Sequence, residues 1–171
     1  KEEMAQQNEL PVTYQTHFKN AAKQYDNKEY KKAMASVDKI LEMFPEHADS
    51  LALKGLLTKA MKDNNEEAYK FIKQALKNSD NKSLMAWNVY GTLKKDENDY
   101  ATAQKCFANA LKLDPLNLSV ACDLAYVQAQ NRDFKALVTT RNLLLQQKPQ
   151  YWFYWTGAIV ANHLAKNYAV A

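Results

Sequence analysis

Residues 84–118 read LMAWNVYGTLKKDENDYATAQKCFANALKLDPLNL, and this stretch decides the fold. Trp87, Tyr90 and Gly91 occupy positions i, i+3 and i+4, which lie on one stripe of a helix. The polar run 96–99 predicts a turn, and Pro115 predicts the end of a second helix. Large and small side chains alternate along that second helix at Tyr100, Ala103, Phe107 and Ala110. The stretch therefore predicts two helices that pack through complementary large and small residues.

The same pattern recurs along the chain. Pro115 and Pro149 lie 34 residues apart, and Pro45 lies 70 residues before Pro115. An aromatic residue followed three positions later by a smaller one marks a second helix at Tyr30 and Ala33, Tyr100 and Ala103, Phe134 and Leu137, and Tyr168 and Ala171. Further repeat positions are Gly55, Ala68 and Trp155. This period and this pattern resemble those of tetratricopeptide repeats.

We therefore expect an all-α fold, a right-handed α–α superhelix of about four tetratricopeptide repeats and part of a fifth. The expected repeats are 14–47, 48–83, 84–117, 118–151 and a truncated 152–171, after an N-terminal segment 1–13 that forms the first helix or leads into it. No polar capping helix follows the last repeat, although solenoids need one for solubility, so we expect a fragment of a longer array.

Composition supports this fold class. The 171 residues include only three Gly and four Pro, too few for the many turns of a β-sandwich or a doubly wound α/β fold. No apolar run reaches the roughly 18–20 residues that span a bilayer, and the polar N-terminus is not a signal peptide. Two cysteines without framework spacing suit a reducing compartment, so we expect a cytoplasmic protein.

Glycines inside the predicted helices need a reason, because Gly costs about 1 kcal/mol relative to Ala there. At Gly55 and Gly91 we expect that the backbone of a neighbouring helix approaches closely.

No catalytic, cofactor-binding or metal-binding residues are predicted. His17, His47 and His163 lie in different repeats without other ligands at metal spacing, so a surface or packing role is favoured over a zinc site or a general base. Cys106 and Cys122 fit helix packing better than a reactive pair. The glycines stand alone within helices, which argues against a phosphate-binding loop.

Three local features carry further hypotheses. The aromatic run 151–155 is predicted to begin the first helix of the fifth repeat. Trp155 would then take the place that Trp87 has in the third repeat, and the other rings would pack on the fourth repeat. The alternative is that the run forms an aromatic platform for a peptide or a base. Lys70, Lys73 and Lys77 form a basic stripe, either a solvated face or a contact to ribosomal RNA. In the fourth repeat we predict an ion pair between Asp123 and Arg141.

Beyond the general repeat, several segments resemble the N-terminal region of the large auxiliary subunit family of the NatA N-terminal acetyltransferase complex. They are SLALKGL (50–56), NEEAY (65–69), AWNVYG (86–91), the residues Lys105, Cys106 and Asn109 around Phe107, Asp123 with Leu124 and Gln128, RDF (132–134), Thr140 with Arg141, and Lys148 with Pro149. The resemblance runs from about residue 14 to the end of the chain.

The resemblance implies a non-catalytic scaffold that binds a separate catalytic acetyltransferase subunit and anchors it on the ribosome for co-translational N-terminal acetylation. It implies no cofactor on this chain, with acetyl-CoA on the catalytic partner, and it gives no reason to expect DNA or membrane binding. The N-terminal repeats of the family are associated with ribosome contact. The alternative is a co-chaperone or another peptide-binding adaptor, but Phe18 and Ala22 occupy the positions where such adaptors clamp a carboxylate.

Overall fold

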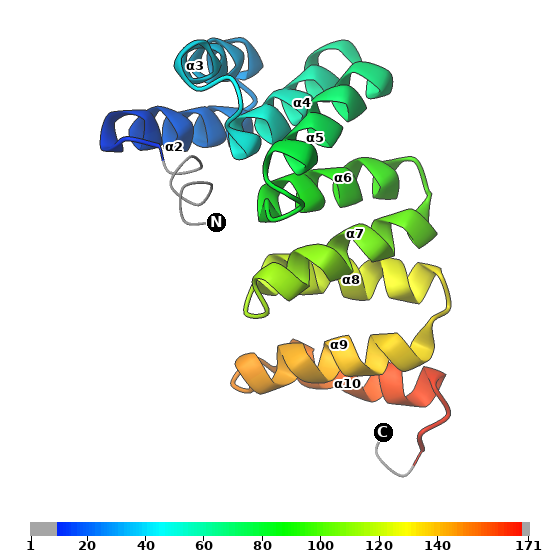
Figure 1. Ribbon diagram of the computed structural model, residues 1–171. Coiled ribbons are helices and arrows are strands. Elements are labelled where there is room, and N and C mark those ends of the chain that lie inside the picture. Colours follow the sequence, from blue (N-terminus) through cyan, green and yellow to red (C-terminus); the bar gives the residue numbers. More distant parts are fainter. Residues whose placement is uncertain (1–9, 169–171) are drawn as a thin grey trace. The chain divides into compact units, whose positions relative to one another are not determined.

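The structure, a computed structural model, describes residues 10–168, and throughout that range it is built from helices and turns without a strand (Figure 1). The helices are α2 (Val12–Asp26), α3 (Tyr30–Met43), α4 (Ala48–Lys62), α5 (Asn65–Asn78), α6 (Leu84–Asp96), α7 (Tyr100–Leu113), α8 (Leu118–Gln130), α9 (Phe134–Gln147) and α10 (Trp152–Leu164). The predicted all-α class is confirmed. Most of the N-terminal segment 1–13, and Ala171 at the end of the last repeat, lie outside the described residues.

The chain divides into two compact units, Lys1–Tyr90 and Gly91–Ala171, with the division inside α6. In the first unit α2 packs on α3, α3 on α4, and α4 on α5. In the second unit α7 packs on α8, α8 on α9, and α9 on α10. Each of these helices thus packs mainly against its neighbours in sequence, as in a repeat array.

Helix ends follow the repeat pattern. Pro45, Pro115 and Pro149 each stand two residues after the last residue of α3, α7 and α9, where a missing backbone N–H costs the helix nothing. Asp99 and Asp133 cap the N-termini of α7 and α9, because a side-chain oxygen of each accepts a hydrogen bond from the backbone N–H three residues later.

The turns inside the repeats share a left-handed residue. Lys28, Asn98, Arg132 and Lys166 have φ of 63°, 61°, 56° and 62°, and the last three recur at intervals of 34 residues. The residue after each donates its N–H to a carbonyl five positions earlier, as Asp133 does to Gln128. This is the Schellman ending of a helix, here formed without the glycine that usually occupies the left-handed position.

Small side chains let the helices approach one another in both cores. The core of the first unit contains Ala21, Ala33, Val37, Leu53 and Leu57. The core of the second unit contains Ala121, Ala125, Leu137, Leu144, Tyr154 and Ala161. These cores hold the exposed faces of the helices in place, and any binding surface must lie on those faces.

Candidate functional site

The predicted repeat positions fall into three classes of burial. Ala33, Ala68, Ala103, Phe107 and Ala110 are fully buried, and Gly55 and Gly91 are buried as well. The aromatic positions Tyr30, Trp87, Tyr90 and Tyr100 are half-buried. Pro45, Pro115, Pro149 and Trp155 are exposed. Packing therefore accounts for seven of these fifteen positions, and the aromatic and proline positions reach the surface in part or in full.

Both predicted close approaches at glycine are present, but their partners differ. A Cβ atom on Gly55 would lie 3.0 Å from the backbone oxygen of Ala68, so a neighbouring backbone approaches as expected. A Cβ atom on Gly91 would lie 2.7 Å from the ring of Phe107. At Gly91 the expected backbone contact is therefore wrong, and an aromatic side chain fills the space instead.

Trp87 and Trp155 make the same local hydrogen bond. The indole N–H of Trp87 donates to the carbonyl of Asn81 at 2.9 Å, and that of Trp155 donates to the carbonyl of Pro149 at 2.8 Å. Both carbonyls lie six residues before the tryptophan, so the two indoles anchor the start of their helices in the same way.

The aromatic run 151–155 is only partly packed. Tyr154 is 7% exposed and belongs to the core of the second unit, and its ring centroid lies 4.1 Å from that of Phe153. Trp152 and Trp155 are 74% and 51% exposed. One ring packs on the fourth repeat as expected, while the other aromatic side chains contribute to an apolar surface on α10.

The predicted ion pair between Asp123 and Arg141 is wrong. Asp123 instead accepts from the ammonium of Lys95 at 2.7 Å, and both side chains are mostly shielded from solvent. Arg141 lies against α10, where its Cδ and Nη1 atoms are 3.2 Å from the position of a Cβ atom on Gly157. Lys95, near the end of α6, and Asp123, on α8, belong to different repeats and line the same groove. Residue spacing within one repeat does not reveal such a contact.

The histidines and cysteines take structural positions. His47 is 7% exposed, and its Nδ1 accepts from the backbone N–H of Ser50, which caps α4. Cys106 is buried, and burial raises the pKa of its thiol to about 11, so it is protonated and a poor nucleophile at neutral pH. Within residues 10–168 no three His, Cys, Asp or Glu side chains are placed to hold a metal ion.

The basic stripe lies on one face of α5. Lys70, Lys73 and Lys77 are all exposed, and none of them forms an ion pair with another described residue. These three ammonium groups on one helix face create a local positive potential, which attracts an anionic surface.

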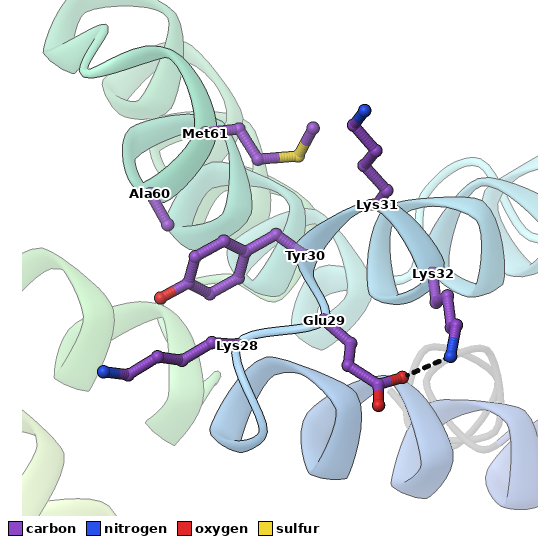
Figure 2. A pocket seen from close by; sticks show the side chains of 7 residues that line it. All are labelled: Lys28, Glu29, Tyr30, Lys31, Lys32, Ala60 and Met61. Atoms are coloured by element: carbon purple, nitrogen blue, oxygen red, sulfur yellow. Dashed lines mark ion pairs between the residues drawn. The ribbon is translucent and has the colours of Figure 1, made fainter.

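A groove of about 510 Å³ opens between the start of α3 and the end of α4, and we call it the Tyr30 groove. Figure 2 shows the Tyr30 side chain reaching toward Ala60 and Met61, with lysine side chains around the opening. Its lining residues are Lys28, Glu29, Tyr30, Lys31, Lys32, Ala60 and Met61. The sequence marked Tyr30 only as a packing position, and no sequence signal indicated Met61.

A second groove of about 410 Å³, the Tyr100 groove, lies beside the first residue of α7 in the second unit. Tyr100 begins α7 as Tyr30 begins α3, and its ring packs edge-on against Tyr126. The lining residues are Lys95, Asp96, Asn98, Tyr100, Cys122, Asp123 and Tyr126. Both grooves thus contain the tyrosine that begins a repeat's second helix, but their other walls differ. The Tyr30 groove has three lysines and reaches the end of α4, whereas the Tyr100 groove has two carboxylates and reaches the end of α6 and the middle of α8.

Among the described residues, none of the helices is both long and apolar enough to cross a membrane.

No protein-family model matches the sequence. The N-terminal acetyltransferase A complex auxiliary subunit NAA15 of Arabidopsis thaliana is 41% identical over 158 residues, which are 92% of this chain and 17% of that protein. The N-alpha-acetyltransferase 16, NatA auxiliary subunit, of Homo sapiens is 40% identical over 164 residues, which are 95% of this chain and 19% of that protein. The chain thus spans under one fifth of the length of these relatives.

Solved structures agree with these relatives. The structure of Naa15/Naa10 bound to HypK-THB contains a chain that matches 91% of this one with a TM-score of 0.85 and 33% identity, over 23% of its own length. YrrB, a TPR protein with an unusual peptide-binding site, matches 88% of this chain and 77% of its own with a TM-score of 0.64. At 17% identity YrrB shows only the shared tetratricopeptide fold.

Proposed function

We propose, on the premise that this chain is homologous to one segment of the NatA auxiliary subunits, that it is part of a non-catalytic scaffold of an N-terminal acetyltransferase complex. The observation that carries this proposal is the agreement of sequence and fold with one relative: about 40% identity to auxiliary subunits over nearly the whole chain, and a TM-score of 0.85 to a chain of the Naa15/Naa10 structure. The resemblance found in the sequence motifs is thereby confirmed.

In this proposal the chain contributes tetratricopeptide repeats, and a separate subunit of the Naa10 kind supplies catalysis and binds acetyl-CoA. Burial leaves the Cys106 thiol of this chain protonated, so Cys106 is not proposed as a nucleophile. The surroundings of Phe18 argue against the co-chaperone alternative. That ring packs at the core of the first unit, with its centroid 5.9 Å from the His47 ring, where it cannot hold a carboxylate.

The second part of the proposal is a cytoplasmic location with contact to the ribosome. It is supported by the three exposed, unpaired lysines of α5, because phosphate groups of RNA are attracted to such a cationic face.

Affinity capture tests the scaffold role. The natural protein that contains this chain, tagged and isolated from its own cells, is expected to bring down an acetyltransferase subunit, and the captured complex should acetylate N-terminal peptides with acetyl-CoA. The separated scaffold should show no turnover. Capture of heat-shock chaperones without an acetyltransferase, or turnover by the scaffold alone, would count against the proposal.

A further inference from the structure

We propose that the Tyr30 groove binds a short acidic segment of another protein, which inserts one apolar side chain beside Tyr30 and Met61 and places carboxylates near Lys28 and Lys31. This inference concerns the first unit only and does not depend on the acetyltransferase complex.

The floor and one wall of the groove are apolar. Met61, near the end of α4, is 40% exposed although it is a large hydrophobic side chain. Ala60 is exposed beside it, the half-buried Tyr30 ring lies near Ala60, and the Met61 side chain extends toward Lys31 (Figure 2). A methionine adapts its shape to an entering side chain and makes favourable sulfur–aromatic contacts with an aromatic one. The wall therefore suits an apolar group, best an aromatic one.

The rim of the groove is cationic. Lys32 is paired with Glu29 at 2.9 Å, which neutralises one lysine and the only carboxylate among the lining residues. Lys28 and Lys31 are exposed, and neither forms an ion pair with another described residue. Within residues 10–168, their two positive charges are therefore not paired with a carboxylate at the mouth of the groove, which selects for an anionic partner.

The Tyr100 groove supplies an internal comparison. It also contains the tyrosine that begins a repeat's second helix, but its charged lining residues are Lys95, Asp96 and Asp123, with Lys95 already paired to Asp123. The charged lining residues of the two grooves are thus opposite in net sign, and an anionic partner suits the Tyr30 groove alone of the two. A phosphate backbone would use the lysines alone and leave Met61 without a role, so the apolar wall favours a peptide over RNA.

Binding is tested with a fluorescein-labelled peptide, Glu-Glu-Phe-Glu-Glu, added to the 171-residue chain and followed by fluorescence anisotropy. The double charge reversal Lys28→Glu with Lys31→Glu is expected to weaken binding about tenfold or more, because it replaces attraction by repulsion. Met61→Gln, which keeps the side-chain length, is expected to weaken binding about fivefold through loss of apolar contact. The matched control, Lys70→Glu with Lys73→Glu on α5, changes the net charge equally and should change the affinity less than about twofold.

The location is tested separately by methyl NMR of the wild-type chain. The Met61 methyl signal should shift on addition of the peptide, while that of Met43, which is 63% exposed on α3, should not. This measurement needs no variant and is unaffected by any loss of folding.

Four results would overturn the proposal: no saturable peptide binding, equal binding of Glu-Glu-Ala-Glu-Glu, equal weakening by the α5 control variant, or an unshifted Met61 methyl signal. Tighter binding of a ten-nucleotide oligouridylate that also depends on Lys28 and Lys31 would assign the groove to RNA instead.

Discussion

Gly91 of α6 lies so close to the ring of Phe107 in α7 that a methyl group at position 91 would come within 2.7 Å of it. Three ring atoms lie within 2.9 Å of that position, and Phe107 is fully buried, so its ring has no free space to enter. The absence of a side chain at this one position is therefore a condition for the contact between the two helices.

Gly91→Ala is expected to lower the free energy of unfolding by about 1–3 kcal/mol, the usual cost of overpacking a core. The clash outweighs the gain in helix propensity, which is about 1 kcal/mol for Gly to Ala. Urea denaturation followed by circular dichroism measures the change. In the Gly91→Ala background, Phe107→Leu should recover part of the loss by making space for the methyl group.

Gly157→Ala is the matched control. Its nearest neighbours are the Cδ and Nη1 atoms of Arg141 at 3.2 Å, the outer part of a flexible side chain that can move aside. The free energy of unfolding should stay within about 1 kcal/mol of the wild type or rise, since helix propensity now acts without a clash. Equal losses at both glycines would contradict the packing explanation.

Arg132→Gly is expected to stabilise the chain by about 1 kcal/mol, because Arg132 has a φ of 56° and a non-glycine residue is strained there. Its side chain is exposed, so little packing is lost. Asn98→Gly, at a φ of 61°, should give a smaller gain, because Asn tolerates the left-handed region better than Arg. Thermal denaturation of the two variants compares them, and a larger gain at Asn98 would refute this order.

Asp99→Ala is expected to destabilise the chain by about 1 kcal/mol at neutral pH through loss of the cap of α7. Hydrogen bonding to Thr102 holds the pKa of the Asp99 carboxyl below its ordinary value of 3.8. Because the folded pKa is lowered, the stabilisation is present above pH 3.8 and is lost as the pH falls through the folded value. The deficit of Asp99→Ala should therefore shrink in acid, as measured by urea titrations at several pH values.

Asp99→Asn provides the control for charge, since its amide oxygen can still cap the helix. This variant should retain most of the stability at neutral pH and lack the acid dependence attributed to Asp99. If the stability deficit of Asp99→Ala stayed constant down to pH 2, the stabilisation of α7 would not depend on ionisation of the Asp99 carboxyl. That result would contradict the role given to the ionised carboxylate.

A double-mutant cycle on Lys95 and Asp123 should yield a coupling energy of about 1 kcal/mol, at the upper end for exposed pairs because both side chains are mostly shielded. The corresponding cycle on Asp123 and Arg141 should yield a coupling close to zero, since their side chains do not pair. Stability measurements on alanine variants supply both cycles. A larger coupling for the second pair would restore the ion pair that the sequence suggested.

Charge reversal of Lys70, Lys73 and Lys77 in the natural protein is expected to weaken co-sedimentation with ribosomes, because these lysines are exposed on one face of α5. The loss of affinity should be larger at about 50 mM than at about 200 mM salt, because a variant with fewer phosphate contacts releases fewer counterions and depends less on salt than the wild type. Neutral variants of the same three residues should have an intermediate effect. Unchanged sedimentation at both salt concentrations would remove the α5 face from the proposal.

The helical class was predictable from this sequence because packing itself is periodic. Large and small residues must alternate at fixed spacing for Phe107 to meet Gly91, and such a pattern is visible without coordinates. The left-handed turns were not predictable, because Lys28 and Arg132 occupy positions where glycine is the usual signal. Their strain is sustained by the helices on either side.

The surface was less predictable than the core. The partner of Asp123 is Lys95, which lies 28 residues earlier and in another repeat, so side-chain reach decides the contact. The Tyr30 groove likewise joins the start of one repeat's second helix to the end of the next repeat's first helix. Met61 in that groove has no sequence feature that separates it from an ordinary core methionine.

The exposed apolar side chains of α10 affect how the chain behaves in concentrated solution. The helix contains no Asp, Glu, Lys or Arg between Trp152 and Leu164, while Trp152, Phe153, Ile159, Val160 and Leu164 are between 41% and 74% exposed. Like charges usually keep dissolved particles apart, and a helix without them offers no such barrier to a second molecule. Self-association of the chain at high concentration is therefore expected to involve α10.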